Sequence, residues 1–134
     1  MVDKELATYL LSKIGATKEF PFDKVTAVYK VMNKMFALVS HKEGLININL
    51  KCLPEDALGY REIYECVIPG YHMNKKHWNT IIINGEMNDE ILQDMIDESY
   101  NLVVNKLTKK EKMILNNYQL DAYASKVFEG NPIV

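Results

Sequence analysis

One short segment of the chain combines cationic side chains, aromatic rings and hydrogen-bonding amides. Within positions 71–79 it contains Tyr71, His72, Asn74, Lys75, Lys76, His77 and Trp78. An aromatic ring that stacks on a nucleobase contributes about 1 to 3 kcal/mol, and lysines contact phosphates. The segment therefore predicts a site for a flat, anionic ligand such as a nucleic acid.

A structural role fits the same residues. Trp78 stands two residues before the strand-like run Thr80-Ile-Ile-Ile83. At such a position a single tryptophan, and Tyr71 with it, more often anchors a loop to the core than stacks on a base. The lysines, for their part, fit an ordinary solvated face. The exposure of these side chains in the fold separates the two interpretations.

The charge pattern favours a local anion-binding face over a basic protein. Sixteen Lys and Arg stand against 18 Asp and Glu, a net charge of -2, which excludes a protein that holds nucleic acid by bulk charge alone. Segment 66–85 carries two lysines and no acid, whereas 86–100 carries six acids. The predicted footprint is the acid-free segment, extended by Lys106, Lys109 and Lys110.

Other chemistry has little support in the sequence. The His72-x4-His77 spacing differs from the His-x3-His spacing of a helical metal site, and no third ligand is indicated. The neighbouring acids Asp89/Glu90 and Asp97/Glu98 point apart on a helix. Gly-x-Ser-x-Gly and glycine-rich phosphate loops are absent. We therefore expect no catalytic residue, no metal and no cofactor, and a chain that is not an enzyme.

Length and composition indicate one globular domain and part of a second. The chain has 134 residues, of which 48% are hydrophobic and 25% charged. Two cysteines are too few for a disulfide framework, so Cys52 and Cys66 are expected to be reduced thiols. The N-terminus lacks an apolar signal segment and no apolar run is long enough to span a membrane, so we expect a cytoplasmic protein.

Four strands and three helices must position the basic segment. Apolar spacing predicts a helix over about 4–14, ending at Gly15. The β-prone runs 25–31 and 34–40 predict a hairpin, and the alternating run 45–51 adds a third strand to an antiparallel meander. A helix is expected over 54 to about 65, a strand at 80–83, and a long core helix from Asp89 with Asn88 as its cap.

The region after residue 112 has a different character. Asn116-Asn117 is expected to break a helix, residues 118–123 are strand-like, and residues 130–132 form a Gly-Asn-Pro turn. The sequence therefore predicts a domain over 1–112, followed by a linker and a first strand over 113–134.

Several motifs together resemble the MmcQ/YjbR family over about residues 5–110. The most specific is Val67-Ile-Pro-Gly-Tyr-His-Met-Asn-Lys-Lys-His-Trp-Asn-Thr80, and Phe20-Pro-Phe22-Asp23 and Asp97-Glu-Ser-Tyr-Asn-Leu-Val103 accompany it. The resemblance implies an α+β domain of double-wing, CyaY-like outline, with an antiparallel sheet and helices on one face, in a family commonly described as DNA-binding. It places the contacts on Lys75, Lys76 and His77, with Lys30 and Lys34 on the neighbouring hairpin.

The stretch 118–132 resembles the opening strand and Gly-Asn-Pro turn of PhzF-like phenazine-biosynthesis proteins, and the likeness covers about residues 116–134. It implies that this chain is an accessory domain fused to a PhzF-like isomerase or epimerase. The expected partners are DNA, bound weakly and in a salt-dependent way, and the fused domain, with no membrane. The alternative is a regulatory or docking domain of such an isomerase without a nucleic-acid role.

Overall fold

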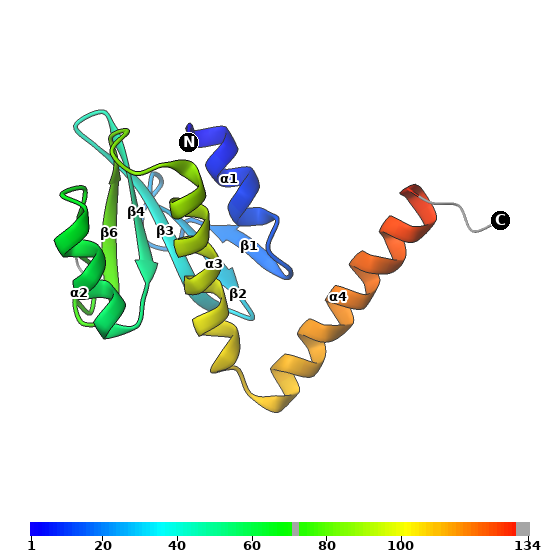
Figure 1. Ribbon diagram of the computed structural model, residues 1–134. Coiled ribbons are helices and arrows are strands. Elements are labelled where there is room, and N and C mark those ends of the chain that lie inside the picture. Colours follow the sequence, from blue (N-terminus) through cyan, green and yellow to red (C-terminus); the bar gives the residue numbers. More distant parts are fainter. Residues whose placement is uncertain (71–72, 131–134) are drawn as a thin grey trace.

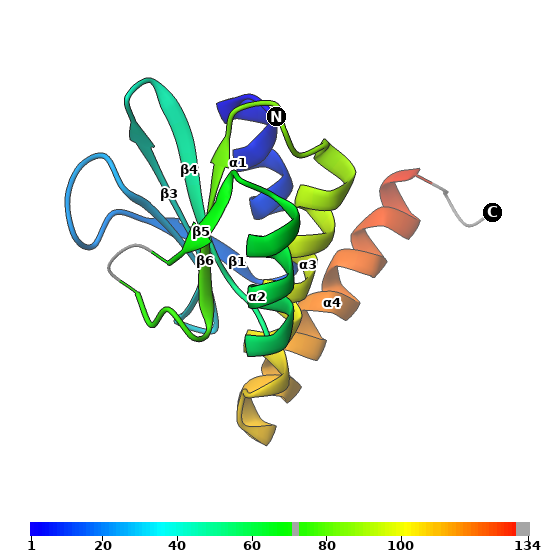
Figure 2. The same ribbon diagram turned by 60° about the vertical axis from the view of Figure 1, so that its left-hand side comes forward.

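The computed structural model describes residues 1–70 and 73–130, and the side chains of 1–70 and 73–124. Its elements are α1 (Asp3–Leu11), β1 (Ala16–Glu19), β2 (Ala27–Val31), β3 (Lys34–Lys42), β4 (Leu45–Lys51), α2 (Pro54–Ile63), β5 (Val67–Pro69), β6 (Trp78–Ile83), α3 (Asp89–Asn105) and α4 (Lys109–Gly130). The strands form one antiparallel sheet in the order β1-β2-β3-β4-β6-β5. Helices α1, α2 and α3 cover one face of it (Figures 1 and 2), which confirms the predicted α+β class.

The predicted meander is confirmed as β2-β3-β4. Met32 and Asn33 link β2 to β3 with φ values of 48° and 64°. Left-handed backbone at both positions defines a type I′ turn, whose twist matches that of the flanking strands. Glu43 and Gly44, with φ values of 54° and 80°, close the β3-β4 hairpin in the same way.

Helix α3 supplies the centre of the core. Its buried stripe, Leu92, Met95, Ile96, Ser99 and Val103, lies on the sheet. The Asn88 side chain accepts a hydrogen bond of 2.9 Å from the Ile91 amide, which confirms the predicted cap. The Ser99 hydroxyl donates to the Phe36 carbonyl at 2.6 Å and accepts from the Lys51 amide at 2.9 Å. This hydroxyl therefore ties α3 to the end of β4.

The N-terminal helix is shorter than predicted, and the strand that follows it was missed. Gly15, with a φ of 74°, turns the chain into β1, which pairs with β2 at the edge of the sheet. Three of the four β1 residues are exposed. Such a strand is held by backbone hydrogen bonds and shows no apolar alternation, so the sequence pattern did not indicate it.

The strand predicted over 118–123 is wrong, because residues 109–130 form the helix α4. A capping box starts this helix: the Thr108 amide donates to Glu111 Oε1 at 3.0 Å, and the Glu111 amide donates to Thr108 Oγ1 at 3.1 Å. Beyond the buried Leu115 the helix projects away from the sheet (Figure 1). The predicted turn at 130–132 extends outside the described residues.

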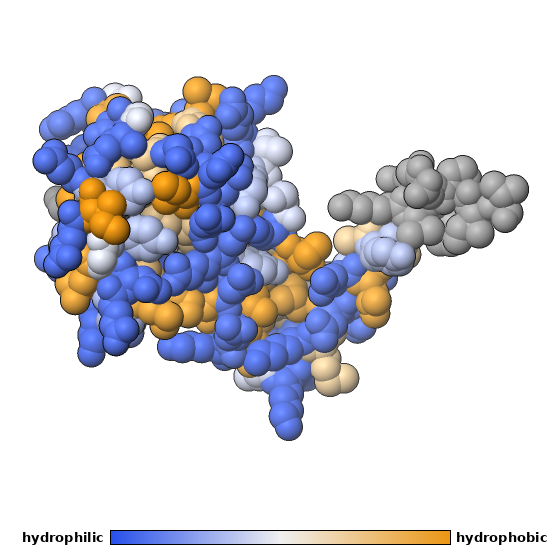
Figure 3. Space-filling view, in the orientation of Figure 1, coloured by the Kyte–Doolittle hydropathy of each residue, from blue (hydrophilic) through white to orange (hydrophobic). Residues whose placement is uncertain are grey.

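The side of the molecule that carries the helices is predominantly hydrophilic (Figure 3). Among the described residues, none of the helices has both the length and the apolar composition needed to cross a bilayer.

Candidate anion-binding site

Helices α1–α3 cover one face of the sheet, and the opposite face is here called the open face (Figure 2). Trp78 packs there with Val28 and Leu38 in a small apolar cluster that Met35 and Met73 border. The indole is only 8% exposed. The core interpretation of Trp78 is therefore confirmed, and this ring offers little surface for stacking on a base.

A pocket of about 620 Å³ lies where the open face meets the end of α3. Four lysines line it, together with two aromatic residues: Lys30, Lys34, Lys51, Lys106, Phe22 and Trp78. We call it the lysine pocket. Lys30 and Lys34 were predicted from the family resemblance, and Lys106 as an extension of the basic footprint. The strands and the helix end bring them together from distant parts of the sequence.

Two of the four lysines have acidic neighbours. Lys30 Nζ lies 2.8 Å from Glu19 Oε2. The pKa of Glu111 is lowered mainly by its hydrogen bonds from Thr108, and the positive charge of Lys34 adds to this effect. The positive charge of the pocket is thus partly neutralised by Glu19 and Glu111.

Lys51 and Lys106 form no ion pair with the residues that the structure describes. Burial lowers the pKa of Lys51, and the charge of Lys106 lowers it further. The two ammonium groups therefore repel each other across the pocket in a partly desolvated setting. An anion bound between them would relieve this repulsion.

Both of these lysines are mounted on rigid elements. Lys51 pairs with Trp78 in the β4-β6 ladder, and its amide donates to Ser99. The next residue, Cys52, donates its amide to the His77 carbonyl at 2.8 Å. Lys106 is the C-cap residue of α3, where the negative end of the helix dipole favours a cation.

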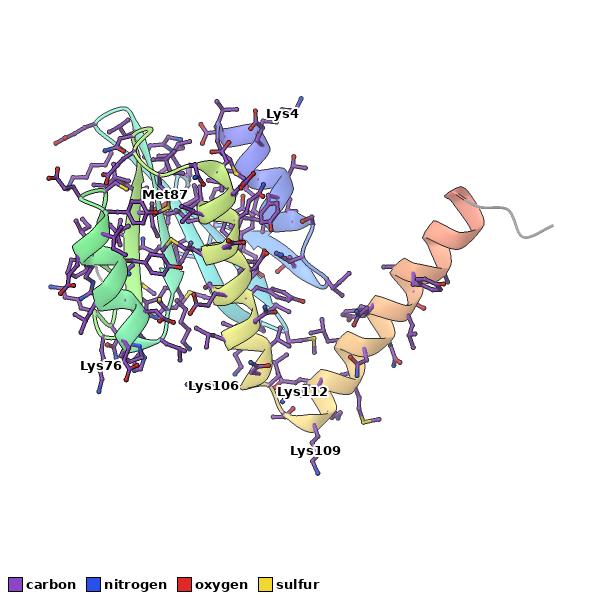
Figure 4. The ribbon with its side chains drawn as sticks, in the orientation of Figure 1. Lys4, Lys76, Met87, Lys106, Lys109 and Lys112 are labelled. Carbon is purple, nitrogen blue, oxygen red and sulfur yellow. The ribbon has the colours of Figure 1, made fainter. Side chains whose placement is uncertain are left out.

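The predicted turn before β6 lies outside the pocket. Lys75 and Lys76 are exposed and His77 is half-buried, and none of the three lines the lysine pocket. Figure 4 places Lys76 and Lys106 toward the same lower edge of the molecule and Lys4 at the opposite end. Tyr71 and His72 lie outside the described residues. The predicted cluster is therefore divided: Trp78 forms part of the pocket and the two lysines lie on an adjacent turn.

Arg61, which the sequence did not single out, holds this turn in place. Its Nε donates to Asn79 Oδ1 at 2.6 Å, and its guanidinium also donates to the carbonyls of Trp78, at 3.3 Å, and Lys75. Asn74 accepts a hydrogen bond of 3.0 Å from the Lys76 amide, so its side chain stabilises the turn. Arg61 is the single arginine in the chain, and its planar fork can satisfy several acceptors at once.

Lys51 was also missed, although the sequence held a signal for it. The alternation that predicted a strand over 45–51 places Asn47, Asn49 and Lys51 on one face. These polar residues showed which face of the strand lies away from the hydrophobic core. It did not show that a helix end would bring Lys106 to the same place.

The second cluster of polar groups lies between α2 and α3. Donor atoms of Cys52, Asp56 and Glu98 lie within 4.8 Å of one another. Burial raises the pKa of Cys52 to about 12, and the charges of Glu98 and Asp56 add to this shift. Cys66, buried beside Glu86, has its pKa raised to about 11. Both cysteines are free thiols, as predicted, and neither is an activated nucleophile at neutral pH.

Replacing Glu98 with glutamine is expected to stabilise the fold at neutral pH. Burial and the neighbouring Asp56 raise the pKa of Glu98 above its ordinary value of 4.5. Wild-type stability therefore falls as the pH rises from 4.5 through the folded-state pKa. Glutamine removes this cost, and the gain should be on the order of 0.5 kcal/mol near pH 7. Thermal melts at pH 7 and at pH 4 measure it.

The gain should become small in the acidic melt, where Glu98 is mostly protonated in both states. The exposed Glu62→Gln on α2 is the matched control and should show neither effect. Equal stability changes for Glu98→Gln at both pH values would contradict the repulsion between Asp56 and Glu98.

Comparisons with known proteins show the family of this chain. The family described as YjbR matches residues 11–102. The uncharacterized protein YbdF of Escherichia coli O157:H7 is 41% identical over 93 residues, which are 69% of this chain and 76% of YbdF. The uncharacterized protein YjbR of Escherichia coli K12 is 32% identical over 115 residues, which are 86% of this chain and 98% of YjbR.

A solved structure shows the same fold. The crystal structure of protein DR2400 of Deinococcus radiodurans, a DUF419 domain, matches with a TM-score of 0.78 and 34% identity, over 84% of this chain and 86% of that one. A crystal structure from Pseudomonas syringae matches with a TM-score of 0.67 and 26% identity, over 76% of this chain and 98% of that one. None of these similarities supports the PhzF-like domain expected after residue 112.

Proposed function

The chain belongs to the YjbR family, and from this premise we propose that it is a nucleic-acid-binding domain whose lysine pocket holds backbone phosphates. The observation that carries the proposal is the pair Lys51 and Lys106. Both side chains line the lysine pocket, and neither has an acidic partner among the described residues. A phosphate bound between them would accept charge-assisted hydrogen bonds from both ammonium groups.

The surroundings of the pair suit a phosphate that carries an organic group. The aliphatic stems of the lysines, Met35 and Trp78 give the pocket an apolar wall. Phe22, at its rim, is 65% exposed. An exposed aromatic ring beside lysines can receive a base or sugar next to a bound phosphate.

The pocket supplies cations and apolar surface, which bind and orient an anion. The carboxylates of Glu19 and Glu111 are engaged with Lys30 and with the α4 cap respectively. Binding therefore fits this arrangement better than acid-base catalysis. Because the chain has a net charge of -2, the affinity should be modest and strongly dependent on salt.

A salt titration tests the proposal. Binding of the full chain to labelled DNA, followed by fluorescence anisotropy at several salt concentrations, should weaken linearly in a double-logarithmic plot. With two to four phosphates neutralised, the slope should be about -2 to -4. An affinity that does not change with salt, or no association at low salt, would overturn the proposed function.

A further inference from the structure

The open face carries a continuous polar track that begins at the lysine pocket. In the β4-β6 ladder Lys51 pairs with Trp78, Asn49 with Thr80 and Asn47 with Ile82. Alternate residues of a strand point to the same face and are about 7 Å apart. The track therefore runs from a cation through two side-chain amides, on a rigid platform.

A second pocket lies over the far part of this track. It has a volume of about 440 Å³. On β4, β5 and β6 it is lined by Asn47, Asn49, Thr80, Leu45, Ile68 and Ile82, and on β3 and the β3-β4 hairpin by Ser40, His41, Lys42 and Glu43. We call it the amide pocket. A flat, uncharged ring with hydrogen-bonding edges binds in a pocket that has polar groups at its base and aliphatic side chains around them. The strands supply both.

The two amides differ in how they are engaged. The Thr80 hydroxyl donates to Asn49 Oδ1 and fixes the orientation of that nearly buried side chain. Asn47 is half-buried, and its carboxamide forms no hydrogen bond with the described residues. Asn47 can thus offer a donor and an acceptor to a ligand, and asparagine makes such paired contacts with base edges.

We infer that the nucleic acid is single-stranded, with a phosphate in the lysine pocket and a neighbouring base in the amide pocket. This inference rests on the proposed function. A base can enter such a pocket only when it is unstacked and unpaired. In a duplex each base stays stacked between its neighbours, so the pocket cannot enclose it. Sheet faces with flanking loops read single strands in this manner.

Labelled short homopolymers of each base, and a duplex of matched length, test the inference by anisotropy with the full chain. A single strand should bind about tenfold more tightly than the duplex, with one base preferred by about tenfold. Asn47→Ala should remove the base preference and leave the salt slope unchanged. Threonine has a higher strand propensity than alanine, so Asn47→Thr repeats the test if Asn47→Ala lowers the melting temperature.

The exposed Asn101→Ala on α3 is the matched control and should retain the preference. Equal binding of single strand and duplex, or a base preference that survives both Asn47 variants, would overturn the single-strand inference. If neutralising Lys51 and Lys106 still weakened binding in that case, the proposed function would stand. Absence of any salt-dependent binding would overturn both.

Discussion

Replacing Arg61 with methionine is expected to lower the free energy of unfolding by about 2 kcal/mol. Asn79 is fully buried, and its side chain bridges Arg61 and the Ala57 carbonyl. Without the guanidinium, Asn79 Oδ1 loses its donor in a place that water does not reach. The carbonyls of Lys75 and Trp78 lose a donor too, so the turn before β6 should loosen. Urea denaturation gives the stability, and amide hydrogen exchange over 73–78 reports the turn.

A double-mutant cycle with Asn79→Ala separates this interaction from general loss of packing. Because the two side chains act as one unit, the double variant should cost little more than either single variant. Glu62→Met, on the exposed side of α2, is the matched control and should change stability by less than about 0.5 kcal/mol. Additive costs in the cycle would show that Arg61 and Asn79 contribute independently.

Replacing Lys51 and Lys106 together with glutamine is expected to weaken DNA binding at low salt by about a hundredfold or more, since each charge-assisted hydrogen bond contributes about 1.5 to 3 kcal/mol. The salt slope should become shallower by about two, because each of the two lysines neutralises one phosphate in the wild-type complex. Anisotropy titrations of wild type and variant, at matched salt concentrations, measure both quantities.

This weaker binding should not come with loss of stability. The lowered pKa of Lys51 means that its charged form is disfavoured in the fold, so removing the charge costs nothing near pH 7 and relieves repulsion with Lys106. That relief should shrink as the pH rises through the folded-state pKa of Lys51. Lys4→Gln, which removes one positive charge at the opposite end of the molecule (Figure 4), is the control for charge lost away from the pocket. If the double variant binds DNA with the same affinity as Lys4→Gln, the lysine pocket does not take part in DNA binding.

The elements that sequence analysis found are those with signals within a few residues. The turn at Met32-Asn33, the alternation over 45–51 and the Asn88 cap each act through local backbone geometry or one hydrogen bond, and each appears in the structure. Helix α4 had such a signal as well. The Thr108-x-x-Glu111 capping box is in the sequence, but the prediction for this region rested on the asparagines at 116–117 and did not include it.

The elements that were missed are too exposed or too short to show an apolar alternation. Strand β1 is mostly exposed and β5 has three residues, so their backbone pairing with neighbouring strands defines them. The arrangement of the candidate site, too, could not be predicted from residues that are neighbours in the sequence. Lys75, Lys76 and Trp78 are close together in sequence, yet the structure buries the indole and leaves the two lysines on a turn.

By itself the sequence determined the α+β class, the central meander, the core helix and the family, because these follow from local sterics, side-chain period and motif. Only the tertiary structure decided which charges meet. Lys30, Lys34, Lys51 and Lys106 come from two strands, a strand end and a helix end, and share a pocket through the sheet register and the docking of α3. Such convergence depends on contacts between residues far apart in the chain, which no short window of sequence contains.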